Sequence, residues 1–145
     1  MSDFNSTHNR AVWFDIPVAD LDRAAAFYRG VLAIGVDKTQ FDDFTFCLLE
    51  HHDGNGGCLI LQPGEVASNA GILVYMNVNG RMRDAMGRVT ALGGKVLEPM
   101  HAIGPHGFRA VVLDSEGNRI ALHSTTDAQA RNPTSDPQAA NARGA

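Results

Sequence analysis

The chain has 145 residues, 44% of them apolar, which is enough for one domain with a substantial core. Its formal net charge of −4 offers no basic face, so we expect no nucleic-acid partner. Its longest apolar runs are far shorter than the roughly 20 residues of a membrane-spanning helix, so we expect no membrane partner. We interpret the two cysteines as reduced thiols, and the polar N-terminal segment has no apolar stretch typical of a signal peptide. These features predict a cytoplasmic protein.

The first half of the sequence resembles the second half. WFDIPVADLDRAAAFYRGVL, which starts at Trp13, aligns with LVYMNVNGRMRDAMGRVTAL, which starts at Leu73, an offset of 73 − 13 = 60. In each copy a mostly apolar strand is followed by a segment whose apolar residues recur at helical spacing. We expect the side chains of Asp20 and Asn79 to cap the first turns of these two helices.

The second part of each copy repeats as well. FTFCLLE at Phe44 aligns with FRAVVLD at Phe108, and after a turn GCLILQP aligns with NRIALHS. Both turns contain Asn and Gly, which tolerate the positive φ of tight hairpins. VDKTQF and KVLEP predict one further short strand in each copy. The order of elements is therefore βαβββ twice, which predicts an α+β fold.

The repeat and the composition divide the chain. We expect a single domain over residues 8–124, with module one at about 8–63 and module two at about 71–124. Residues 125–145 contain no Leu, Ile, Val, Met or aromatic side chain, so they have nothing large and apolar to bury. They are predicted to form a disordered polar tail.

Two segments carry a family resemblance, IPVADLDRAAAFYRGVLAIG at Ile16 and LDSEGNRIALHS at Leu113. Together with the internal repeat they resemble the glyoxalase/bleomycin resistance/extradiol dioxygenase (vicinal oxygen chelate) superfamily over roughly residues 8–124. The stretch GKVLEPMHAIGPHGFRAVVLDSEGN looks most like the branch related to lactoylglutathione lyase. The resemblance implies curled mixed sheets that enclose a cleft, often completed across a dimer. We therefore expect a homodimer.

Metal-dependent members of this superfamily place one ligand on the first strand and one on the last strand of each module. Aligned residue by residue, those four positions are Trp13, Ile60, Leu73 and Ala121. Leu, Ile and Ala have no donor atom, and the indole N–H of Trp only donates. Glyoxalase and dioxygenase members need a metal as a Lewis acid. We therefore expect a metal-independent protein without a cofactor.

Strand alternation gives each sheet one apolar face and one face that mixes aromatic, charged and amide groups, which suits a small ligand with a few polar groups. On the mixed face we expect Asp15 and His123 as a catalytic acid–base pair. In the alternative interpretation Asp15 is solvated or bonds Arg119, and His123 is a rim residue. The predicted ligand-binding residues are Trp13, Gln62, Tyr75, Asn77 and Arg119, with His101 and His106 from the segment MHAIGPHGF.

Two of these predictions have open alternatives. Trp13 either stacks on a ligand or fills the space of a lost metal site. His101 and His106 either belong to a loop over the cleft or, with a carboxylate, hold a relocated metal.

The predicted function is binding of a small organic molecule in the cleft, with the reaction unassigned. One alternative is a lyase or isomerase of the glyoxalase type, or a dioxygenase, that uses a non-standard acid–base or metal site. Another is a drug-sequestering or regulatory binding protein. The fold alone does not decide between them.

Overall fold

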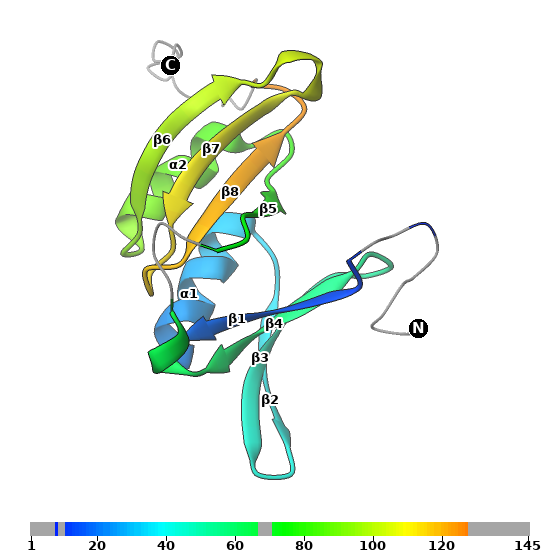
Figure 1. The fold of residues 1–145 in the computed structure, drawn as a ribbon, viewed down its shortest axis with the longest axis vertical. Helices are drawn as coiled ribbons and strands as arrows, with labels where there is room; N and C mark the ends of the chain where they lie inside the picture. Colours follow the sequence, from blue (N-terminus) through cyan, green and yellow to red (C-terminus); the bar gives the residue numbers. More distant parts are fainter. Residues whose placement is uncertain (1–7, 9–10, 67–70, 128–145) are drawn as a thin grey trace.

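The computed structural model describes residue 8, residues 11–66 and residues 71–127. Within these residues two βαβββ modules follow one another, each with a four-stranded mixed sheet and one helix (Figure 1). This confirms the predicted α+β fold. The first module contains β1 (Trp13–Val18), α1 (Leu21–Leu32), β2 (Val36–Phe41), β3 (Phe44–Leu49) and β4 (Gly56–Leu61). The second contains β5 (Val74–Asn77), α2 (Met82–Ala91), β6 (Lys95–Ala102), β7 (Phe108–Leu113) and β8 (Arg119–Ser124).

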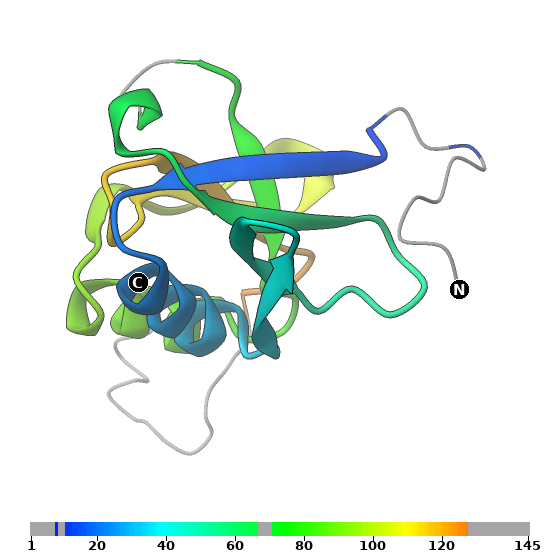
Figure 2. The ribbon, with the colours of Figure 1, turned by 90° about the horizontal axis from the view of Figure 1, so that it is seen from below.

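The two sheets have the same topology. Their strand orders are β1-β4-β3-β2 and β5-β8-β7-β6. The first and last strands of each module pair in parallel, and the other neighbours pair antiparallel. Both sheets are open, since each has two edge strands. The two helices lie side by side and cover the same side of the pair of sheets (Figure 2).

The core lies between the sheets and the helices. Apolar side chains alternate along the strands, so one face of each sheet is apolar and packs under the helices. The predicted helical face of α1 is buried, and Phe27 adds to it. Buried strand residues that share this core are Ile16, Val18, Val36, Cys47, Leu49, Leu59, Met76, Ala110, Val112, Ile120 and Leu122, and Val78 joins them directly after β5.

The helices approach each other closely at Gly30 of α1. A Cβ atom at this position would lie 2.5 Å from Cδ1 of Leu92, the C-terminal cap of α2. Arg81, which precedes α2, donates from Nη1 to the carbonyl oxygen of Val31 at 2.6 Å. The two modules are therefore packed through their helices.

One of the two predicted helix caps is wrong. Asp20 caps α1 as predicted, because its Oδ1 accepts from the backbone N–H of Arg23 at 3.0 Å. The second helix begins only at Met82, because Gly80 has a positive φ of 80° and interrupts the chain after Asn79. Asn79 Oδ1 instead accepts from the backbone N–H and the hydroxyl of Thr125 at 2.6 and 2.7 Å.

The beginning of the predicted polar tail contacts the second module. Thr125 bonds Asn79, and the carboxylate of Asp127 lies 3.7 Å from the guanidinium of Arg83. The rest of the predicted tail, from residue 128, lies outside the described residues. In the described part of the chain, no helix has both the length and the apolar character that crossing a membrane requires.

The segment MHAIGPHGF, predicted as a loop, is partly strand. β6 continues to Ala102, so His101 lies on a strand and pairs with Arg109 of β7. His106 lies in a short 3-10 helix, η2 (Gly104–His106). The two histidines therefore belong to different local structures.

Candidate functional site

The polar groups lie on the face of each sheet that points away from the helices, which we call the open face. On the second sheet this face carries Tyr75, Arg109 and His123, because their neighbours along the strands belong to the core. On the first sheet it carries Asp15 and Cys58. Each sheet therefore carries a cluster of polar side chains on its open face.

The group on the second sheet is centred on Arg109. Its Nη1 donates to the hydroxyl oxygen of Tyr75 at 2.6 Å, and its Nε donates to Nε2 of His101 at 3.3 Å. Its Nη2 lies 3.6 Å from Oε1 of Glu98, too far for a normal hydrogen bond. The side chain of Arg109 is 27% exposed and that of Glu98 is 50% exposed. The guanidinium is thus held by two neutral partners and stays accessible.

The hydrogen bonds define the neutral forms of two histidines. Nδ1 of His101 lies 2.9 Å from the carbonyl oxygen of Pro99, so it carries the hydrogen and leaves Nε2 to accept from Arg109. Nε2 of His123 lies 2.7 Å from the carbonyl oxygen of His106, so Nδ1 of His123 is the acceptor. The rings of His123 and Tyr75 are 6.4 Å apart.

The group on the first sheet is centred on Asp15. Its Oδ1 accepts from the indole N–H of Trp13 at 3.2 Å and from the thiol of Cys58 at 3.3 Å. Burial raises the pKa of Cys58, and the adjacent carboxylate of Asp15 raises it further, to about 12. Since the thiolate is the reactive form, Cys58 is not suited to act as a nucleophile near neutral pH.

The predicted pair of Asp15 and His123 has separate partners in the structure. Asp15 bonds Trp13 and Cys58 on the first sheet, and His123 bonds the backbone of His106 on the second. A catalytic role for the pair therefore stays a prediction.

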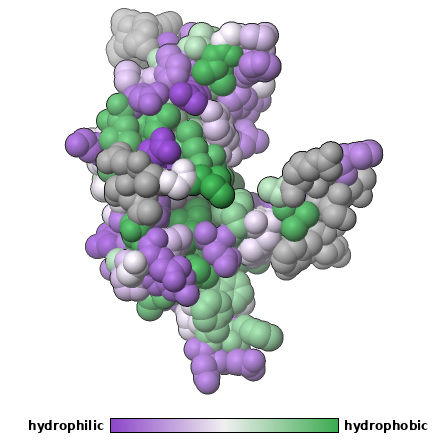
Figure 3. All heavy atoms as spheres, in the orientation of Figure 1, coloured by the Kyte–Doolittle hydropathy of each residue, from purple (hydrophilic) through white to green (hydrophobic). Residues whose placement is uncertain are grey.

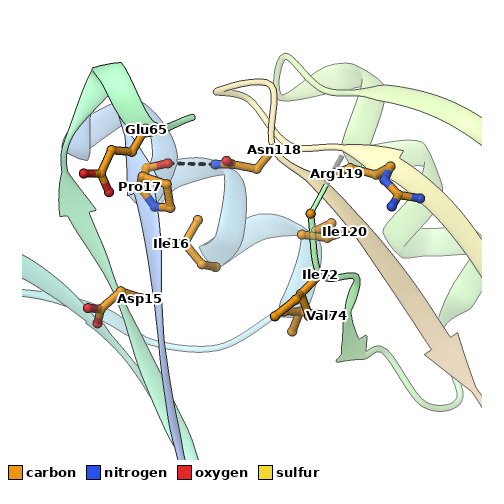
Figure 4. Close-up of a pocket in the computed structure, with 10 residues that line it drawn as sticks. Asp15, Ile16, Pro17, Glu65, Ile72, Val74, Asn118, Arg119 and Ile120 are labelled. Atoms are coloured by element: carbon orange, nitrogen blue, oxygen red, sulfur yellow. Dashed lines mark hydrogen bonds between the residues drawn. The ribbon is translucent and has the colours of Figure 1, made fainter. Parts of the chain in front are cut away.

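A cavity of about 190 Å³ lies between the modules (Figure 4). The side chains of Ile16, Ile72 and Ile120 lie around its middle. Asp15 and Glu65 line the side of the first module, and Arg119 lines the opposite side. The buried Nε of Arg119 has no hydrogen-bond partner in the described part of the chain.

Other predicted ligand-binding residues have different partners or surroundings. Asn77 borders a second cavity, of about 380 Å³, but its Oδ1 accepts from the backbone N–H of Asn79 at 2.8 Å. Gln62 is exposed just before the short 3-10 helix η1 (Pro63–Glu65). Among the predicted residues, Tyr75, His101 and His123 gather around Arg109, and Trp13 lies beside Asp15.

The four positions that align with the metal ligands of the superfamily do not form a donor set. Ile60 and Ala121 are buried hydrocarbon side chains, 8% and 0% exposed, and Leu73 also lacks a donor. The indole N–H of Trp13 is used as a donor to Asp15. Over residues 11–66 and 71–127, His, Cys, Asp and Glu side chains form no group of three that could hold a metal ion. These residues do not fit the metal centre of the superfamily.

Arg109 is absent from the predicted site, although the sequence contains a signal for it. In β7, Phe108, Ala110 and Val112 face the core, so alternation places Arg109 on the open face. The prediction used alternation only for the first and last strands of each module. Applied to the third strand, it finds the residue at the centre of the cluster.

Comparison with known proteins supports the fold. Residues 10–45 match the sequence family described as bleomycin resistance protein-like N-terminal. No curated protein matches the chain significantly. A hypothetical protein from S. aureus is 16% identical with a TM-score of 0.64, covering 81% of this chain and 95% of its own. A glyoxalase-related enzyme from Fulvimarina pelagi is 19% identical with a TM-score of 0.60, covering 80% and 88%.

A third similar structure is the genomically encoded fosfomycin resistance protein FosX from Listeria monocytogenes. It is 13% identical with a TM-score of 0.62, covering 81% of this chain and 94% of its own. At these identities the likeness establishes the fold and leaves the activity open. The chain therefore has the fold of the glyoxalase/bleomycin resistance/dioxygenase superfamily, and residues 10–45 of its first module are similar in sequence to the bleomycin resistance protein-like family.

Proposed function

We propose that this protein binds a small organic molecule on the open face of its second sheet, at the cluster of Tyr75, Arg109, His101 and His123. The observation that carries the proposal is the guanidinium of Arg109, which is ordered by Tyr75 and His101 and yet 27% exposed. Polar groups held in place before binding lose little conformational entropy when a ligand arrives. The opposite face of the same sheet is apolar and packs on α2, so the polar cluster has no role in the core.

The proposed binding is independent of a metal. The four positions discussed above offer hydrocarbon side chains and an indole that donates to Asp15. A Lewis acid at those positions would lack ligands.

An acid–base reaction is the second candidate. It is favoured by His123, whose ring is fixed by the carbonyl of His106 so that Nδ1 is the proton acceptor. In this candidate, a lyase or isomerase of the glyoxalase type, His123 takes a proton from the bound molecule. Product formation that is lost in His123→Gln, while binding persists, would establish it.

We also propose that the protein is a homodimer. The family resemblance implies a cleft that is often completed across a dimer, and both sheets of this chain are open, each with two edge strands. Apolar residues reach the surface on the β2–β3 hairpin, where Phe41 and Phe44 are 67% and 46% exposed (Figure 3). Equilibrium sedimentation at micromolar concentration tests this, and Phe44→Asp is expected to weaken association.

The proposed compartment is the cytoplasm. Cys47 and Cys58 are both free and buried, at 1% and 5% exposure. Free thiols are typical of a reducing compartment. Localisation of the tagged full-length chain in cells tests this proposal.

A thermal-shift screen of small organic molecules tests the binding function. A compound that binds only the native state raises the melting temperature, and we expect the shift to be the same with and without EDTA. Arg109→Gln and Tyr75→Phe should reduce the shift. The matched control is Arg88→Gln, which removes an exposed arginine on α2 that pairs with Asp84 at 3.2 Å.

Two results would contradict the proposal. One is that the hits raise the melting temperatures of Arg109→Gln and Tyr75→Phe as much as that of the parent chain. The other is a crystal structure of a hit bound elsewhere, for instance in the intermodule cavity. A shift that disappears with EDTA would contradict metal independence alone.

A further inference from the structure

We infer that the ligand of the proposed site carries an oxyanion, which binds to Arg109 and Tyr75 in competition with the carboxylate of Glu98. This inference rests on the proposed function and adds the chemical class of the ligand. It follows from the directions of the hydrogen bonds, from the charges around Arg109 and from the shape of β6.

The donors of the cluster converge at one place. Because the oxygen of Tyr75 accepts from Nη1 of Arg109 at 2.6 Å, the hydroxyl hydrogen of Tyr75 is left to donate. Nη1 and Nη2 of Arg109 carry four hydrogens, more than the bond to Tyr75 uses. A guanidinium and a hydroxyl 2.6 Å apart can donate to the two oxygens of one carboxylate or phosphonate.

The two histidines leave the charge of Arg109 uncompensated. His101 accepts from Arg109 through Nε2 and donates through Nδ1 to Pro99, which is the arrangement of a neutral ring. Nε2 of His123 donates to the carbonyl of His106. Among the described residues, the ion pair recorded for Arg109 is with Glu98, at 3.6 Å.

Glu98 approaches Arg109 without forming a close bond. Its Oε1 is 3.6 Å from Nη2 of Arg109 and 4.0 Å from Nε2 of His101, and the side chain is 50% exposed. The register of β6 against β7 shifts on both sides of Glu98, between Val96 and Glu98 and again between Glu98 and His101. Such irregularities redirect side chains. Here they bring a carboxylate to within 3.6 Å of the guanidinium without forming a normal hydrogen bond.

This arrangement makes Glu98 an internal competitor. A half-exposed ion pair contributes little to stability because solvent screens it, so a ligand can displace Glu98 at low cost. Removing the charge of Glu98 should therefore strengthen binding of an external oxyanion. Removing the charge of Arg109 should weaken it.

The test uses three probes with the same ring: benzoate, phenylphosphonate and the neutral benzamide. Binding to the full chain is followed by chemical-shift titration of the Arg109 Nε–H signal, assigned by its loss in Arg109→Gln. We expect benzoate or phenylphosphonate, whichever geometry fits, to shift this signal while benzamide does not. Tyr75→Phe should weaken that probe about 5- to 100-fold. Glu98→Gln should tighten it by about 2- to 5-fold.

Arg109→Gln lacks the Nε–H signal, so probe binding to this variant is measured from its backbone amide signals. We expect the anionic probe to bind this variant about 10- to 100-fold more weakly than the parent chain. Arg88→Gln is the charge-matched control and should bind as the parent does. Glu98→Gln also covers the case in which Arg109→Gln fails to fold, because an increase in affinity cannot arise from misfolding.

The outcomes are distinguishable. Benzamide binding as tightly as the anions, with the same dependence on Tyr75, would overturn the oxyanion and leave small-molecule binding in place. If Arg88→Gln weakened binding of the anionic probe as much as Arg109→Gln does, the loss would reflect net charge alone, and the inference would be overturned. Unchanged or weaker binding in Glu98→Gln would overturn the competition. If every probe and every screening hit bound Tyr75→Phe and Arg109→Gln as tightly as the parent chain, the proposed function would be overturned as well.

Discussion

The hydroxyl of Tyr28 on α1 donates a hydrogen bond of 2.5 Å to Oδ2 of Asp114, across the boundary between the two modules. Both side chains are buried, at 0% and 2% exposure. Asp114 also accepts from the backbone N–H groups of Glu116 and Asn118, each at 2.8 Å. The turn of the second module is thus bonded to the helix of the first.

Glu116 in the same turn makes a second connection. Its Oε1 accepts from the backbone N–H groups of Ala19 and Asp20, at 3.0 and 3.1 Å. Both of its oxygens accept from Arg23 at 2.7 Å. This carboxylate therefore occupies the N-terminus of α1, where a negative charge is favourable.

We expect Tyr28→Phe to lower the free energy of unfolding by about 1–3 kcal/mol, because a buried carboxylate loses one of its donors. Urea denaturation measures the change. The control is Tyr75→Phe, which removes the same atom from a side chain in a residue that is 48% exposed and should change stability by less than about 0.5 kcal/mol. Equal effects of the two variants would mean that the bond across the modules contributes nothing specific.

Ionisation of Tyr28 should require unfolding. Burial raises the pKa of Tyr28 well above 10, and the neighbouring Asp114 raises it further. The unfolded chain then loses this proton near pH 10 while the folded chain keeps it, so stability should fall as the pH rises above 10. The chain has two tyrosines, so in Tyr75→Phe the near-ultraviolet absorbance of tyrosinate reports on Tyr28 alone. Absorbance that rises while circular dichroism stays native would contradict this prediction.

Glu116 should make the protein sensitive to acid. Burial raises the pKa of Glu116, but hydrogen bonds from Arg23, Ser115 and the backbone of Ala19 outweigh it and lower the pKa below 4.5. The carboxylate therefore contributes stability above about pH 4.5 that is lost as the pH falls through its folded pKa. Glu116→Gln should be less stable at pH 7 and show a flatter loss of stability between neutral and acidic pH. If the stability of Glu116→Gln fell with pH in parallel with that of the parent chain, Glu116 would not be the source of the acid sensitivity. Glu65→Gln, at an exposed position, is the control.

Cys58 should react slowly with thiol reagents. With its pKa at about 12, the thiolate fraction at pH 8 is only about 10⁻⁴. Asp15→Asn removes a negative charge beside the sulfur, so we expect faster alkylation of Cys58 than in the parent chain. Mass spectrometry after timed iodoacetamide labelling measures this, and Cys47, which is also buried and has a raised pKa, serves as the internal reference. Unchanged labelling of Cys58 would show that burial alone controls it.

Asp15 and His123 should act independently on ligand binding. Each bonds partners on its own sheet, so the effects of Asp15→Ala and His123→Ala on the affinity of a screening hit should add within about 0.5 kcal/mol. We expect His123→Ala to have the larger effect, since its ring lies beside Tyr75. A coupling energy above about 1 kcal/mol would instead support the acid–base pair predicted from the sequence.

Local patterns in the sequence were sufficient to predict the helices and strands, but they were insufficient to predict the contacts between them. Helical spacing and the cap at Asp20 predicted α1, and alternation predicted most strands to within one or two residues. The start of α2 was missed because Gly80 and Arg81 delay it. The contacts of Tyr28 with Asp114 depend on how two modules pack, which no periodicity encodes. The position of Arg109 on the open face, by contrast, follows from alternation along β7.

The bond between Tyr28 and Asp114 also makes the two halves unequal. In the repeat, Arg88 aligns with Tyr28 and Glu50 aligns with Asp114. Arg88 pairs with Asp84 on its own helix, and Glu50 accepts from the backbone of Gly35 within its own module. The sequence DSEGN, which occurs only in the second half, therefore links the two modules through Asp114 and Glu116.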